Sequence, residues 1–332
     1  MNHQAQTTAN LERRIHDAET DLFAAVGADV EEFVLDLAQT GLRVRVLSVG
    51  HGPPVVLLHG VTENAAIWAP LFANLRQFRL LAVDLPGHGL SDPATFRRGQ
   101  VREHARQLID DILDALSLDN APVIGHSLGG MFALWHAAAG SNRISQVVAI
   151  GVPAVALPGV RVRMPLSLLT VRGLAIAVLR SPSPHRVYRR LLAQGLGSAE
   201  VAAAPDPLIQ ALRLSARRPG NARTMASLMH AIDRFRRPRP ESVLTSAELA
   251  AITTPTIFIL GSDDPYLPVG RARTSIDQIE GARLCEMPGG HAPWLVDPDH
   301  TAALIAAHSH FATGPHPTPA AGGNLRPNAS AR

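Results

Sequence analysis

The segment Gly125-His126-Ser127-Leu128-Gly129 places a serine between two glycines in the spacing G-x-S-x-G. An apolar run from Pro122 precedes it and a helix-compatible run over residues 131–139 follows it, so the serine is predicted at a sharp strand-to-helix turn. Such a turn lifts the serine oxygen clear of the sheet, and the start of the helix leaves backbone N–H groups free for a developing oxyanion. The pattern alone arises by chance in roughly one chain of this length in ten, so its partners must come from elsewhere in the chain.

A serine nucleophile needs an adjacent base, and the base needs a group that orients it. Two loops further along the chain contain such groups: residues 261–268 hold Asp263 and Asp264, and residues 288–294 hold His291. Each loop directly follows a predicted strand, at the sheet edge where sites of open α/β sheets form. The chain order is then Ser127, Asp264 and His291, the order of nucleophile, acid and base known from α/β-hydrolases.

The segments that must position these residues alternate between short apolar runs and amphipathic runs. This alternation predicts an α/β fold with a mostly parallel sheet and helices on both faces. Central strands are predicted over residues 54–58, 79–83, from 122, 147–150, 256–260 and 282–287, with helices over 66–75, 101–116 and 269–279. Residues 1–8 are predicted disordered, followed by a helix over 11–25 capped by Asn10 and by peripheral strands over 32–37 and 42–49.

Residues 153–250 break the alternation, because they contain several short apolar helical segments punctuated by prolines and no matching strand. We expect a helical cap inserted into the fold. The last helix is predicted from about Asp297 to Phe311. The expected organisation is an N-terminal helix and first strand over 1–39, a core over 40–152 and 251–312, a cap over 153–250, and a disordered tail over 313–332.

Composition excludes several other functions. The chain has 332 residues, 46% of them hydrophobic, and all of its 31 basic residues are arginines, nearly balanced by 28 acidic ones. We therefore expect a sizeable core and no nucleic-acid partner. The single cysteine, Cys285, excludes an intrachain disulfide, and no histidine cluster or phosphate-binding glycine loop indicates a metal or cofactor. The N-terminus lacks a signal-peptide pattern, and Arg172 interrupts the longest apolar stretch, residues 165–179, so a cytoplasmic protein without a membrane span is expected.

Five segments in a fixed order resemble those of a capped serine hydrolase of the α/β-hydrolase-fold superfamily, of the esterase or lactonase kind. They are Leu58-His59-Gly60, Asp84-Leu85-Pro86-Gly87-His88-Gly89-Leu90-Ser91-Asp92, Gly125-His126-Ser127-Leu128-Gly129-Gly130, Gly261-Ser262-Asp263-Asp264-Pro265 and Gly290-His291. The resemblance covers residues from about 40 to 311. It implies the α/β-hydrolase fold and a small-molecule substrate.

The resemblance also implies roles for individual residues. Ser127 would be the nucleophile and His291 the general base and then acid. The acid of similar proteins lies three residues after the glycine that ends its strand, which selects Asp264 and leaves Asp263 as the alternative. The backbone N–H groups of Val61 and Leu128 would bind the oxyanion.

Three further residues are candidates for lining the pocket. His59 lines the site or, as the resemblance implies, braces its loop. His126 touches substrate or packs beside the serine turn, and Trp294 lines the pocket or belongs to the core.

Serine in place of aspartate at the turn argues against alkyl halide or epoxide chemistry, which similar proteins perform with aspartate. The expected function is hydrolysis of an ester, thioester or lactone of a small lipophilic substrate through an acyl-enzyme on Ser127. Lipophilicity is suggested by the apolar cap segment 164–179. The alternatives are a carbon–carbon bond hydrolase, a cofactor-free peroxidase or a non-catalytic small-molecule-binding protein of the same fold. The sequence does not indicate an oligomeric state.

Overall fold

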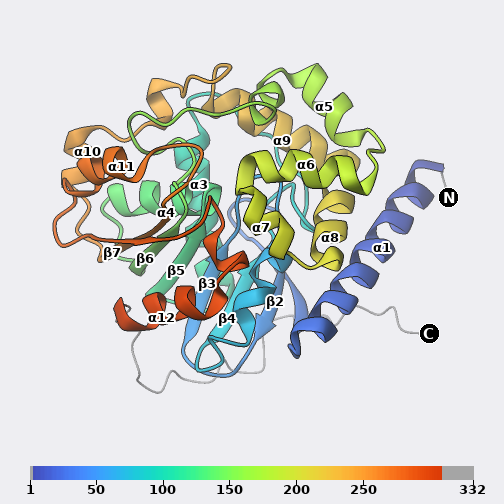
Figure 1. The fold of residues 1–332 in the computed structure, drawn as a ribbon, viewed down its shortest axis with the longest axis horizontal. Coiled ribbons are helices and arrows are strands. Elements are labelled where there is room, and N and C mark those ends of the chain that lie inside the picture. Colours follow the sequence, from blue (N-terminus) through green and yellow to red (C-terminus); the bar gives the residue numbers. More distant parts are fainter. Residues whose placement is uncertain (1–2, 309–332) are drawn as a thin grey trace.

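The buried apolar runs of the chain form one sheet at the centre of the molecule. The computed structural model describes residues 3–308 (Figure 1). The strands are β1 (Glu31–Asp36), β2 (Arg43–Val49), β3 (Pro54–Leu58), β4 (Arg79–Val83), β5 (Ala121–His126), β6 (Ile144–Ile150), β7 (Thr256–Gly261) and β8 (Arg283–Met287). Their spatial order is β1-β2-β4-β3-β5-β6-β7-β8, with β1–β2 and β2–β4 antiparallel and all other neighbours parallel. The predicted mostly parallel sheet is confirmed.

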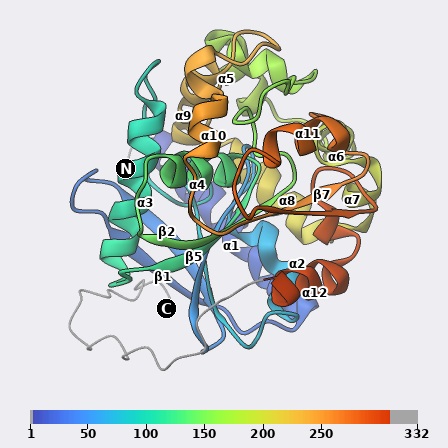
Figure 2. The ribbon, with the colours of Figure 1, turned by 90° about the vertical axis from the view of Figure 1, so that its left-hand side faces the viewer.

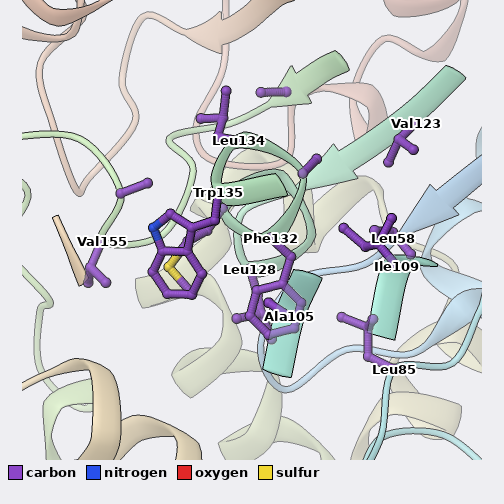
Figure 3. Close-up of a cluster of buried hydrophobic side chains, with 14 of the residues drawn as sticks. Leu58, Leu85, Ala105, Ile109, Val123, Leu128, Phe132, Leu134, Trp135 and Val155 are labelled. Carbon is purple, nitrogen blue, oxygen red and sulfur yellow. The ribbon is translucent and has the colours of Figure 1, made fainter. Parts of the chain in front are cut away.

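Helices cover both faces of this sheet. One face carries α3 (Val101–Ala115), α4 (Leu128–Ala138) and α11 (Val269–Ile276), and the other carries α1 (His3–Val26), α2 (Ala69–Phe72) and α12 (Pro298–His308) (Figure 2). Helix α4 is apolar on all sides because it packs on the sheet and against α3 at once. Figure 3 shows Leu128 and Phe132 of α4 beside Ala105 of α3.

The strand order creates a crevice at one point of the sheet. Strands β3 and β5 are neighbours, but the chain leaves β3 toward β4 on one side and leaves β5 toward β6 on the other. Open α/β sheets bind ligands at such a switch point, beyond the carboxyl ends of the strands. The loop after β3 begins with His59-Gly60-Val61, and the turn after β5 holds Ser127, so both lie at this crevice.

A helical segment, residues 153–250, separates β6 from β7. Figure 1 shows its helices α5, α6 and α9 together above the strands. Its elements are η2 (Leu166–Thr170), α5 (Arg172–Arg180), α6 (His185–Leu196), α7 (Ser198–Ala203), α8 (Asp206–Ala216), α9 (Pro219–Ile232), η3 (Pro240–Ser242) and α10 (Ser246–Ala250). The assignment of this segment as a cap domain, and the other predicted domain boundaries, remain predictions.

Two predicted helices differ in the structure. Helix α1 begins at His3, so Asn10 lies inside it and is not its cap, and residues 3–8 are helical. No glycine or proline in residues 3–10 stops a helix that is already nucleated. The helix predicted over 66–75 is a 3-10 turn, η1 (Ala65–Trp68), followed by the single turn α2. Both turns are almost wholly buried, so their apolar pattern reflects burial and not one helix face. The predicted tail lies outside the described residues.

Helix α1 is fixed to the sheet by a buried ion pair. Arg45 of β2 donates to the carboxylate of Glu19 on α1 at 2.7 and 2.8 Å, and its Nε lies 2.8 Å from Oδ2 of Asp84. The side chains of all three are at most 2% exposed. Helix α1 also packs along α8 of the helical segment, so it connects that segment to the sheet (Figure 1). None of the helices within the described range is both long and apolar enough to cross a membrane.

Candidate active site

Ser127 lies at the tip of the turn that joins β5 to α4. Its backbone has φ 47° and ψ −102°, a conformation that costs a non-glycine residue about 1–3 kcal/mol. The glycines on either side are required by close packing. A Cβ at Gly125 would stand 2.4 Å from the nitrogen of Gly130, and one at Gly129 would stand 2.1 Å from the carbonyl oxygen of Leu58. The G-x-S-x-G spacing therefore follows from the approach of strand and helix at this turn.

His291 and Asp264 are joined by a short hydrogen bond between the loops after β8 and β7. His291 Nδ1 donates to Asp264 Oδ2 at 2.7 Å, and the backbone N–H groups of Val152 and Tyr266 donate to the same carboxylate at 2.9 and 3.0 Å. Burial by itself raises the pKa of Asp264, but the charge and hydrogen bond of His291 and the two N–H groups outweigh it and hold that pKa below its usual range. Asp264 is therefore ionised at neutral pH and able to orient His291.

The neighbouring Asp263 takes a different position. Its side chain is exposed and accepts a hydrogen bond from the Ser262 hydroxyl at 3.4 Å, while its N–H donates to Gly289 at 2.9 Å. The structure thus pairs His291 with Asp264 and leaves Asp263 at the surface of the turn.

Ser127 and His291 line the same cavity, which has a volume of about 370 Å³. Ser127 is 6% exposed and His291 3% exposed. Within residues 3–308 the Ser127 hydroxyl makes no hydrogen bond to the His291 ring. Hydrogen bonds between a nucleophile and its base are often long until substrate binds. The position of both side chains at one cavity is therefore the observation that brings Ser127 and His291 together.

Two backbone donors lie beside Ser127. Leu128 is the first residue of α4, so its N–H has no partner inside the helix. Val61 lines the cavity from the loop after β3. Neither N–H donates a hydrogen bond to another described residue. The Gly129 N–H donates to the carbonyl of His59 at 3.1 Å, which ties the loop after β3 to the serine turn.

A buried acid at this site was missed by sequence reasoning. The Glu63 carboxylate accepts from the Gly60 N–H at 2.6 Å and from His126 Nδ1 at 2.9 Å. His126 Nε2 donates to the carbonyl of His291 at 3.1 Å. Both ring nitrogens of His126 thus face oxygen acceptors, so the ring is held on both sides. Burial raises the pKa of Glu63, but the charge and hydrogen bond of His126 outweigh it and keep that pKa below the usual range.

The pair formed by Glu63 and His126 connects the loop after β3, the serine turn and the loop of His291. No sequence signal marks Glu63 as buried, since it stands in a polar turn three residues after Gly60. His126 lines the cavity and also packs beside the serine turn, so its position agrees with both of the roles considered from the sequence.

Glu63→Gln should lower kcat more than it changes KM. The amide oxygen can still accept from Gly60 and His126, but it lacks the negative charge that strengthens both hydrogen bonds. We expect the free energy of unfolding to fall by about 1 kcal/mol, the difference between a hydrogen bond to a charged group and one to a neutral group. Steady-state kinetics and urea unfolding measure both effects. Glu280→Gln, at an exposed position, is the matched control. If both variants behave alike, Glu63 does not position the site.

His59 and Trp294 do not line the cavity. His59 Nδ1 donates to the Gly60 carbonyl at 2.7 Å and its Nε2 accepts from the Leu85 N–H at 3.0 Å, so the ring braces two loops. Burial lowers the pKa of His59, in agreement with a neutral ring. Trp294 is fully buried, stacks on Trp68 with ring centroids 5.0 Å apart and donates to the Ile67 carbonyl. The core interpretation of Trp294 therefore fits its position.

The helical segment 153–250 supplies most of the apolar cavity wall. These residues are Met164, Pro165, Leu166, Leu168, Leu169, Val178, Leu179, Leu191, Leu192 and Leu196. The segment also holds the loop of His291, because the His291 N–H donates to the Leu196 carbonyl at 2.7 Å and the Gly290 N–H donates to the Glu200 carboxylate. The same helical segment therefore shapes the cavity wall and holds the loop that carries His291. Among residues 3–308 no cluster of three or more His, Cys, Asp or Glu side chains could hold a metal ion.

Comparison with known proteins adds an independent observation. The model of a family described as "alpha/beta hydrolase fold" matches residues 53–298. The pimeloyl-[acyl-carrier protein] methyl ester esterase of Nitrosomonas europaea is 27% identical over 280 residues, 80% of this chain and 98% of that protein.

Two further proteins are similar. A 2-hydroxy-6-oxononadienedioate/2-hydroxy-6-oxononatrienedioate hydrolase of Cupriavidus pinatubonensis is 27% identical over 277 residues, 81% of this chain and 88% of that protein. The crystal structure of carboxylesterase CesB from Bacillus subtilis superimposes with a TM-score of 0.70 at 20% identity, over 90% of this chain and 98% of that one.

Proposed function

The chain belongs to the α/β-hydrolase fold family, and on that premise we propose that it is a serine hydrolase that cleaves an ester, thioester or lactone through an acyl-enzyme on Ser127. The relatives support hydrolase activity in general. One observation carries the finer proposal: Ser127 and His291 line one cavity, with the ionised Asp264 bonded to the far nitrogen of His291. Serine at the strained turn suits acyl transfer.

In the proposed reaction Ser127 Oγ attacks the substrate carbonyl carbon while His291 Nε2 takes the proton of the Ser127 hydroxyl. The resulting oxyanion accepts hydrogen bonds from the N–H groups of Val61 and Leu128. Asp264 holds the imidazole in orientation and stabilises its positive charge. The carbonyl re-forms, and the leaving oxygen or sulfur departs with the proton from His291. Water, deprotonated by His291, then releases the acid by the same steps.

The apolar wall from the helical segment supports a lipophilic acyl or alcohol group. A cavity of about 370 Å³ lies within the range of small-molecule sites, roughly 300–1,000 Å³. We infer that one apolar chain or ring of the substrate lies against this wall while its carbonyl meets Ser127.

A fluorophosphonate probe should label the protein stoichiometrically at Ser127, since the probe reacts only with an activated serine. Peptide mapping by mass spectrometry identifies the labelled residue. A panel of p-nitrophenyl esters from acetate to decanoate should then show kcat/KM rising with chain length as the acyl chain covers the apolar wall. A folded sample that remains unlabelled would contradict the serine mechanism, and a strict preference for acetate would contradict the lipophilic substrate.

Carbon–carbon bond hydrolysis is the second candidate. It is favoured by one observation, the relative named as a 2-hydroxy-6-oxononadienedioate hydrolase, which is as similar to this chain as the methyl ester esterase. Turnover of a 2-hydroxy-6-oxo-dienoate, monitored by loss of its visible absorbance, at a higher kcat/KM than any ester of the panel would select this alternative.

A further inference from the structure

One wall of the cavity of Ser127 is positively charged. We name it the basic wall and define it as Arg213 of α8, Arg217 directly after α8, and Tyr188 of α6. All three residues line the same cavity as Ser127 and His291. The sequence alone does not mark these positions, because Arg213 and Arg217 lie 86 and 90 positions after Ser127 and arginines at the ends of helices are usually solvated surface.

The two arginines of the basic wall have no carboxylate partner among the described residues. Arg213 donates from Nη1 to the Ser183 carbonyl at 3.0 Å, and from Nε and Nη2 to the Gln210 amide oxygen at 3.2 and 2.8 Å. These neutral acceptors occupy three of its five N–H groups. The Nε of Arg217 is buried and has no hydrogen-bond partner within residues 3–308.

Two neighbouring arginines outside the cavity are paired with carboxylates. Arg189 of α6 pairs with Asp206, and Arg218, next to Arg217 in sequence, pairs with Glu12 of α1. Exposed arginines of α6, Arg186 and Arg190, also have no carboxylate partner among the described residues, but they do not line the cavity. Arg213 and Arg217 differ from them because they bring an unpaired positive charge to the cavity wall, which a third arginine, Arg163, also lines. Burial lowers the pKa of Arg213, and the positive charges of Arg217 and Arg14 lower it further, so these groups repel one another.

Tyr188 adds a third donor to this wall. Its hydroxyl is buried and has no hydrogen-bond partner among the described residues. Burial and the negative charge of Glu63 raise the pKa of Tyr188, so the phenol keeps its proton. Glu63 also lines the cavity, but its carboxylate accepts from Gly60 and His126 and forms no ion pair with the arginines of the basic wall.

We propose that the basic wall is a carboxylate subsite, so that the substrate of Ser127 carries a carboxylate group apart from the bond that is cleaved. Free guanidinium N–H groups and a phenol hydroxyl bind a carboxylate with charge-assisted hydrogen bonds, and arginine suits it best because its N–H groups are arranged as a fork. The substrate is then amphiphilic, with an apolar part against the wall formed by the helical segment. This inference rests on the proposed function of Ser127.

The test compares esters that differ only in charge. Mono-p-nitrophenyl adipate and p-nitrophenyl hexanoate have the same acyl chain length, and 4-carboxyphenyl butyrate and phenyl butyrate have the same acyl group. The first pair tests a carboxylate on the acyl part and the second tests one on the leaving group. We expect one charged ester to have a kcat/KM roughly ten- to a hundredfold above its neutral counterpart. Equal or lower values for both charged esters would overturn the proposal.

Variants then identify the residues responsible. Arg213→Gln and Arg217→Gln should each lower the charged-to-neutral ratio of kcat/KM by about tenfold or more. Arg186→Gln is the matched control, since it removes one arginine charge from an exposed position of α6 outside the cavity, and it should leave the ratio unchanged. Use of the ratio separates loss of recognition from partial loss of folded protein. An equal ratio in all three variants would refute the assignment of these arginines.

A binding measurement tests the carboxylate subsite without requiring that any ester is hydrolysed. Monoethyl adipate is titrated calorimetrically into the Ser127→Ala protein and into the same protein carrying Arg213→Gln, with ethyl hexanoate as the neutral reference. Tighter binding of the charged ester that is lost with Arg213→Gln supports the subsite even if no ester is hydrolysed, in which case only the proposed reaction fails. Hydrolysis of neutral esters together with equal binding of both compounds would leave the proposed reaction intact and reject the subsite.

Discussion

Ser127→Ala should lower kcat by at least about a thousandfold on any true substrate, because the remaining groups retain only oxyanion stabilisation and binding. The measurement is steady-state hydrolysis of the best ester in the panel, with unfolding monitored to show that the variant is folded. Loss of one hydroxyl that is not bonded to the His291 ring should change stability little, so the effect on kcat reports chemistry.

Two further variants test whether the loss is specific to the Ser127 hydroxyl and its base. Ser181→Ala is the matched control, because Ser181 also lines the cavity, and it should retain most of the activity. The double variant Ser127→Ala with His291→Ala should be no slower than Ser127→Ala alone, since a nucleophile and its base act as a unit. Full activity in Ser127→Ala, or an additive loss in the double variant, would contradict the proposed mechanism.

Arg45→Met should reduce the free energy of unfolding by about 3–5 kcal/mol, because it leaves buried carboxylates without their counter-charge. The Arg45 side chain is 1% exposed and holds Glu19 of α1 and Asp84 after β4. Asp84 in turn accepts from the N–H groups of Ala65 and Leu90. Loss of Arg45 thus loosens both α1 and the loops on which the site rests. Urea unfolding followed by circular dichroism gives the value.

Arg43→Met is the control for this prediction. Arg43 lies on the same strand, but its side chain is 65% exposed and its partner Asp36 is 76% exposed. Exposed pairs contribute at most about 1 kcal/mol. If the two methionine variants have equal stability, the buried ion pair does not anchor α1.

Local pattern was sufficient to predict the centre of the fold. The runs 54–58 and 79–83 match β3 and β4 at both ends, because a strand covered on both faces is an unbroken apolar run bounded by turn residues. The same reasoning misplaced the helix at 66–75, where burial on all sides produces apolar residues without a helical stripe. It also placed the start of α1 too late, because Asn10 is a good cap that the chain does not use.

The serine turn could be predicted for a similar reason. Its glycines, its serine and the change from strand to helix are adjacent in sequence, and close packing at one turn determines all of them. The choice between Asp264 and Asp263 could not be made from the residues alone, since the two differ by one position and the structure directs only one toward His291.

The sequence by itself determined the type of sheet, the strand-to-helix turn at Ser127 and the order of the residues proposed to act with it, because each is encoded by neighbours in the chain. Only the tertiary structure decided which groups meet. Glu63 and His126 are 63 positions apart, and Arg213 reaches the cavity of Ser127 only because the helical segment folds over the sheet. Such pairings depend on strand order and on burial, and neither can be derived from the order of residues along the chain. Burial matters because it lowers the local dielectric and so raises the energetic cost of each unpaired charge.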